Sequence, residues 1–111
     1  MNHFNKLTPA EAERLALLAE EAAEVIQVIG KVLRHGYRSV HPNGGPHNRD
    51  LLADEIGDLM AALEMMQDAR DLSVQRIAFA RLDKLERCAQ YMHHQPKAKR
   101  RRAAGTEGNH G

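Results

Sequence analysis

The sequence lacks tryptophan and holds only two tyrosines and two phenylalanines in 111 residues. Its core must therefore be built from leucine, isoleucine, valine, methionine and alanine, and a chain of this length buries only a modest core. A chain of this kind often gains stability when its helix faces are buried against a second copy. We therefore expect a homodimer or a homotetramer.

Cysteine and long apolar runs are also scarce. Cys88 is the sole cysteine, which excludes an intrachain disulfide and favours a reducing environment. No apolar stretch approaches the roughly 20 residues that a membrane-spanning helix needs. The opening residues, MNHFNKLTPAEAERL, lack the basic start and the apolar run of a signal peptide. We therefore expect a cytoplasmic protein that makes no membrane contact.

The net charge of +1 is unevenly distributed. Residues 96–111 contain five basic residues and one acidic residue, a net +4, whereas residues 1–95 contain 11 basic and 14 acidic residues, a net −3. We expect residues 1–95 to form one helical domain and residues 96–111 to form a basic, disordered tail. The tail has no interleaved aromatic residues, so a contact with nucleic acid would be weak and would not read sequence.

Three helices are predicted, and no stretch shows the alternation of a β-strand. The first covers about residues 8–35, because Thr8, Pro9 and Glu11 form a typical helix start with a capping box. Apolar residues then recur every three or four positions, which predicts a core-facing stripe. The stripe consists of Leu15, Leu18, Ala22, Val25, Ile29 and Leu33.

The second helix is predicted to begin near Asn48 or Asp50 and to end at about Arg70, and the third is capped by Ser73 and ends before Pro96. The long segment between the first two helices, HGYRSVHPNGGPHNR, is rich in loop-forming residues and is long enough to be a lid or a binding loop. The predicted fold class is all-α: an antiparallel bundle of three main helices with a long loop between the first two, completed by oligomerisation.

Two groups of carboxylates interrupt the apolar pattern, one in each of the first two helices. They are Glu20, Glu21, Glu24, Glu55 and Asp58. The first three share one helix face, which we predict to lie roughly opposite the Val25–Ile29 stripe. None of the five has a lysine or arginine three or four positions away, whereas Glu11 has Arg14 at i+3.

Like charges at helical spacing are unfavourable, so something positive is expected between the two groups. If the two helices pack antiparallel, Glu21 and Glu24 can face Glu55 and Asp58 across the seam. Such a cage offers only oxygen ligands, which Mg²⁺ and Mn²⁺ prefer. The alternative is an acidic, solvated face whose charges pair with basic residues of the third helix.

The motifs EEAAE at 20–24 and EIGD at 55–58 resemble the EExxE…ExxD signature of the MazG-like nucleotide pyrophosphohydrolases, an all-α NTP pyrophosphatase family. The likeness covers most of residues 8–92. It implies a Mg²⁺-dependent enzyme, with Mn²⁺ as the other candidate ion. The implied substrate is a nucleoside triphosphate, and the products are the monophosphate and pyrophosphate.

By position, the resemblance assigns roles to individual residues. Glu20 and Glu21 would be catalytic, Glu20 by orienting or deprotonating water. The metal ligands would be Glu21, Glu24, Glu55 and Asp58. Basic residues on the helix after ExxD would bind phosphate, which here points to Arg81 and Lys84, and the loop aromatic Tyr37 could stack on a nucleobase.

The loop is where the sequence departs from the family pattern. Thirty residues separate Glu24 from Glu55, and the excess lies in the loop, so we expect a different substrate pocket. The base-stacking tryptophans of some relatives have no counterpart. The loop also holds His35, His41 and His47, which nothing in a Gly-Pro segment predicts to converge on a transition metal.

Two other functions are compatible with the sequence. A phosphoribosyl-ATP pyrophosphohydrolase-like enzyme would share the chemistry and differ in substrate. A non-catalytic helical binding module would use its acidic face to dock a basic partner. Product analysis separates the two enzymes, and pyrophosphate release from a panel of nucleotides separates an enzyme from the binding module.

Overall fold

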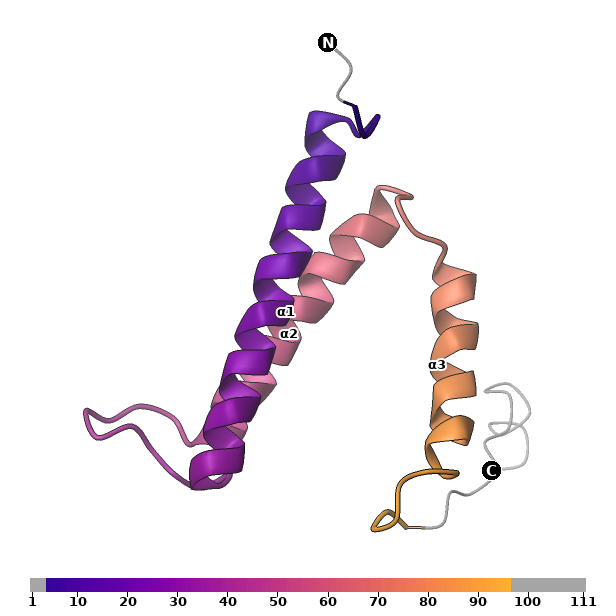
Figure 1. Cartoon of the computed structure of the whole chain (residues 1–111). Helices are drawn as coiled ribbons and strands as arrows, with labels where there is room; N and C mark the ends of the chain where they lie inside the picture. The colour runs from indigo at the N-terminus through magenta and orange to yellow at the C-terminus, as the bar shows by residue number, and fades with distance from the viewer. Residues whose placement is uncertain (1–3, 97–111) are drawn as a thin grey trace, which may run out of the picture. The chain divides into compact units, whose positions relative to one another are not determined.

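The structure is a computed structural model that describes residues 4–96, and its secondary structure there is helical apart from one isolated β-bridge. Helix α1 spans Pro9–His35, α2 spans Asn48–Asp68 and α3 spans Val74–Cys88 (Figure 1). The predicted all-α class is confirmed. The predicted tail lies, beyond Pro96, outside the described residues.

The start of α1 follows from its first four residues. The Thr8 hydroxyl accepts a hydrogen bond from the Glu11 amide at 3.1 Å, and the Glu11 carboxylate accepts one from the Thr8 amide at 2.8 Å. Pro9 occupies the first helical position, where its missing N–H costs nothing. Gly36 ends the helix with a φ of 87°, a backbone conformation that glycine adopts without strain.

The other helix boundaries match the prediction less closely. Helix α2 begins at Asn48 as expected and ends two residues before Arg70. Helix α3 ends before Pro96, as predicted, but it stops as early as Cys88. The amides of residues 90 and 91 bond to carbonyls three positions back, which tightens the chain into turns.

Helices α1 and α2 lie side by side and form an antiparallel hairpin (Figure 1). At the open end, Arg14 forms an ion pair with Asp71, and it does not form the i+3 pair expected with Glu11. At the loop end, the Asn48 side-chain amide donates to the Gly36 carbonyl at 3.1 Å. The hairpin is therefore fastened by polar contacts at both ends.

The seam between α1 and α2 follows the predicted stripe only in part. Val28 of α1 and Ala62 and Met66 of α2 are its fully buried apolar residues in the described chain. Three members of the predicted stripe, Leu15, Ile29 and Leu33, are exposed, Leu33 to 82%. Both helices carry more apolar positions than one seam can bury, so hydrophobic periodicity alone did not identify the inward face.

Several large apolar side chains are consequently exposed. On the hairpin they include Ile26, Leu33 and Met60, and on α3 they include Val74 and Phe79. Oligomerisation stays a prediction, and these side chains are the surface that it would bury. None of the described helices is both long enough and apolar enough to cross a membrane.

The described chain falls into two compact units, which meet between Leu72 and Ser73 in the sequence. The first contains the hairpin and its loop, and the second contains α3. Within the second unit, Lys84 donates to the Tyr91 hydroxyl at 2.8 Å, and Asp83 forms an i, i+4 ion pair with Arg87.

Candidate metal centre

Four carboxylates meet in the middle of the hairpin seam. Each offers one oxygen, and the four oxygens all lie within 4.8 Å of one another. Two residues come from α1 and two from α2: Glu21, Glu24, Glu55 and Asp58. These are the four residues that the sequence predicted as metal ligands, and the hairpin brings them together.

The position of the cluster follows from helix geometry. Glu21 and Glu24 are three residues apart and so project from adjacent turns of one face, as do Glu55 and Asp58. The predicted orientation of the first pair is nevertheless wrong. Glu21 and Glu24 are half-buried on the packing face that also carries Val28, because the seam passes through residues 18, 21, 25 and 28.

Two oxygens of the cluster are buried without a partner. Oε2 of Glu21 and Oε2 of Glu55 have no hydrogen-bond donor within residues 4–96. The ion pairs in that range are Arg14–Asp71 and Asp83–Arg87, and neither reaches the cluster. Buried polar atoms are nearly always paired in folded proteins, so these two oxygens are acceptors available to a cation or to a hydrogen-bond donor.

Protonation behaviour points to the same conclusion. The pKa of Glu21 is raised, chiefly by its burial and then by the negative charges of Glu24 and Asp58. The pKa of Glu55 is also raised. The first cause is a hydrogen bond with Glu24 that requires a proton on one of the two carboxyl groups, and the second is burial. Both carboxyl groups therefore hold a proton more readily than an ordinary glutamate does, and a bound cation would relieve the same repulsion.

The donor set fits a hard divalent cation. It consists of carboxylate oxygens from four side chains, with no thiolate or imidazole among them. Mg²⁺ and Mn²⁺ favour such ligands, and Mg²⁺ keeps several waters and commonly binds substrate phosphates as well. Four oxygens within 4.8 Å of one another can surround one ion of this type.

The other predicted site residues lie outside the cluster. Glu20 is exposed beside Glu21, and its charge contributes to the raised pKa of that residue. Tyr37 is about half exposed in the loop, where the Arg49 guanidinium lies 5.7 Å from its ring centre. Arg81 and Lys84 are on α3 in the second unit, so their role as phosphate ligands stays a prediction.

Two features that position the cluster had no signal in the sequence. The sequence predicts Asn48 as a helix start, and the structure adds that its buried side chain joins the start of α2 to the residue that ends α1. The Arg14–Asp71 pair joins residues 57 positions apart, a separation that helical spacing rules do not address. Both contacts hold α1 and α2 in the register that aligns the carboxylates.

Comparisons of this chain with protein-family models, with curated proteins and with solved structures found no match. The case for function therefore rests on the geometry and chemistry of the carboxylate cluster, together with the motifs that supply it.

Proposed function

We propose that this protein is a cytoplasmic, Mg²⁺-dependent nucleotide pyrophosphohydrolase of the MazG-like type. It would hydrolyse a nucleoside or deoxynucleoside triphosphate between the α and β phosphates and release the monophosphate and pyrophosphate. The observation that carries the proposal is the set of four carboxylate oxygens that lie within 4.8 Å of one another. Two of the four residues, Glu21 and Glu55, also have a buried oxygen without a hydrogen-bond partner in the described chain. The order of the motifs EEAAE and EIGD supports the same class.

In this proposal the four clustered carboxylates hold the ion, with Mn²⁺ as a substitute for Mg²⁺. When bound, such an ion neutralises phosphate charge and lowers the pKa of coordinated water. The chain's own contribution is geometric. The fastened ends of the hairpin hold Glu21 and Glu24 opposite Glu55 and Asp58 before any ligand arrives, which reduces the cost of ordering the site.

Glu20 has a different role in the proposed reaction. It is exposed and lies outside the clustered oxygens, yet it directly precedes Glu21. A carboxylate in this position is free to accept a proton from a water molecule that approaches the substrate at the cluster. We assign Glu20 to orienting or deprotonating that water, while Glu21 serves as a ligand.

The test is an assay of pyrophosphate release from a panel of NTPs, dNTPs and modified nucleotides with Mg²⁺. We expect release with at least one of them, and a loss of about 100-fold or more in Glu21→Gln and Glu55→Gln, since even outer-shell changes at metal sites cost about 10–100-fold. Glu64→Gln, which changes an exposed glutamate of α2 outside the cluster, serves as the matched control.

Two results would contradict the proposal. One is a folded, Mg²⁺-supplied preparation that releases no pyrophosphate from any nucleotide in the panel. The other is an active preparation in which Glu21→Gln retains the activity of the Glu64→Gln control. Either result would favour a non-catalytic module that docks a basic partner on its acidic face.

A further inference from the structure

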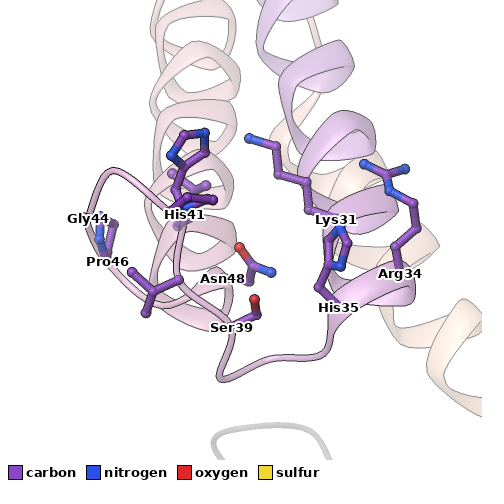
Figure 2. Close-up of a pocket in the computed structure, with 11 residues that line it drawn as sticks. Lys31, Arg34, His35, Ser39, His41, Gly44, Pro46 and Asn48 are labelled. Atoms are coloured by element: carbon purple, nitrogen blue, oxygen red, sulfur yellow. The ribbon is translucent and has the colours of Figure 1, made fainter.

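A cavity of about 370 Å³ lies at the loop end of the hairpin. The last turns of α1, the connecting loop and the first turn of α2 form its walls (Figure 2). Its volume falls in the range of small-molecule sites, which is about 300–1,000 Å³. The cavity lies entirely within the first compact unit, and none of the four clustered carboxylates lines it.

The lining is basic. Four basic side chains contribute to it, and none of the described lining residues is acidic. The four are Lys31, Arg34, His35 and His41. Figure 2 shows the Lys31 side chain extending from α1 toward the loop segment that carries His41. Lysine and arginine are charged at neutral pH, so the cavity presents positive charge to any ligand.

These positive charges are not neutralised in the described chain. Lys31 and Arg34 take no part in an ion pair within residues 4–96. On α1, Lys31 has Gln27 and Val28 behind it and Arg34 and His35 ahead of it at helical spacing, so no local carboxylate compensates it. Lys31 is nevertheless half-buried, which makes the absence of a partner more costly than at an exposed position.

The loop that closes the cavity is held by specific contacts. The backbone amide of Asn48 donates to the Ser39 carbonyl at 2.9 Å, and Val40 forms an isolated β-bridge with His47. The turn between them uses Gly44 and Gly45, whose φ values of 92° and 118° favour glycine. The basic lining is therefore presented by an ordered wall.

His41 is oriented as a donor within this wall. Its Nδ1 accepts a hydrogen bond from the Asn43 amide at 3.1 Å. In the neutral ring this contact places the proton on Nε2, which then serves as a donor. Together with the Lys31 ammonium and the Ser39 hydroxyl, this gives the cavity donors of the kind that bind phosphate oxygens.

We propose that this cavity binds the phosphate group of a soluble phosphorylated small molecule, with Lys31 as the principal ligand and His41 as a second donor. The proposal rests on the cavity alone and does not require the carboxylate cluster to be catalytic. If the proposed hydrolase function holds, the two sites serve one substrate. Lys31 lies seven residues from Glu24, about 10.5 Å along α1, with Val28 between them on the seam.

The test is calorimetric titration of the full chain with inorganic pyrophosphate in a chelator, so that no divalent ion contributes. We expect Lys31→Met to weaken binding about tenfold or more, as loss of a charge-assisted hydrogen bond predicts. Lys31→Arg should retain binding, and Arg38→Ala, a loop cation outside the cavity, is the matched control. The basic residues at 97–102 are present in every variant and contribute equally.

The proposed hydrolase function can fail without affecting this result. Glu55→Gln, which should lower hydrolysis about 100-fold or more, is expected to bind pyrophosphate as well as the wild type does. Equal weakening by Lys31→Met and Arg38→Ala would overturn the proposal, because it would indicate diffuse attraction. Binding of adenosine as tight as that of pyrophosphate, or Lys31-dependent binding only to vesicles containing phosphatidic acid, would also overturn it.

Discussion

Arg14 and Asp71 form a two-bond ion pair that joins the beginning of α1 to the turn after α2. Nε of Arg14 lies 2.6 Å from Oδ2 of Asp71, and Nη2 lies 3.0 Å from Oδ1. The side chains are only 21% and 12% exposed. A paired, partly shielded contact of this geometry holds more firmly than a single-bond surface pair. It fixes the end of the hairpin farthest from the loop.

The first prediction concerns acid stability. The hydrogen bond from Arg14 is the largest cause that lowers the pKa of Asp71. A lowered folded-state pKa contributes stability that is fully present above the unfolded value, about 3.9, and is lost as the pH falls through the folded value. We expect Asp71→Asn to melt at a lower temperature than the wild type at pH 7, with the difference narrowing below about pH 4.

Circular dichroism melts across this pH range measure the effect. Asp68→Asn, at the exposed end of α2, is the control because this residue has no part in the Arg14 contact. A constant difference in melting temperature between Asp71→Asn and the wild type from pH 7 down to about pH 3 would contradict the role given to Asp71.

The second prediction concerns the carboxylate cluster in the absence of metal. Glu24 raises the pKa of both Glu21 and Glu55, which reports repulsion among the three groups. We expect Glu24→Ala to keep or raise the melting temperature in a chelator, because the mutation removes that repulsion. We also expect it to lose most of the stabilisation that Mg²⁺ gives the wild type, since a ligand of the folded state stabilises by mass action.

Thermal melts with and without Mg²⁺ test both halves of this prediction, and Glu64→Ala is the control for helix propensity. A clear fall in melting temperature for Glu24→Ala in the chelator would show that the four carboxylates do not repel one another as described.

The third prediction concerns a helical glycine. Gly57 lies inside α2, and a Cβ built there meets no atom within 4 Å. Alanine at an open helical position is more favourable than glycine by about 1 kcal/mol. We expect Gly57→Ala to raise the free energy of unfolding by about this amount, measured by urea denaturation. A loss of stability would indicate that another chain approaches the α2 backbone at this position.

The fourth prediction concerns Asn48, a residue that is only 7% exposed. Asn48→Ala removes the donor to the Gly36 carbonyl and leaves that acceptor at the loop end without its partner. We expect a loss of about 1–3 kcal/mol in the free energy of unfolding. Asn43→Ala, in the exposed part of the same loop, should change it little, and equal effects of the two mutations would contradict the role of Asn48.

Features encoded by neighbouring residues could be predicted from the sequence. The capping box needs only Thr8 and Glu11, which are three positions apart, and the glycines and prolines between the first two helices predict a loop. The pairing of Glu55 with Asp58 on one face also follows from helical spacing alone. These features do not depend on the rest of the chain, so the structure agrees with them.

Features that depend on which faces meet could not be predicted in the same way. Leu33 and Val28 are equally plausible core residues by periodicity, and the choice between them is made by the register of α1 against α2. The convergence of His35 and His41 on one cavity depends on how the loop turns back, which no local spacing specifies. Long-range contacts such as Arg14–Asp71 set both outcomes.

The way the hairpin is fastened limits how it can deform. The Arg14–Asp71 ion pair at one end and the Asn48–Gly36 hydrogen bond at the other resist sliding and splaying of α1 against α2. The space between the two helices therefore changes most readily if the helices bend. Gly30 and Gly57 are the two glycines inside these helices, and they flank or interrupt the carboxylate turns. Glycine is the residue at which a helix bends most readily. The gap can thus adjust to ions of different radius, such as Mg²⁺ and Mn²⁺, while both ends stay tied.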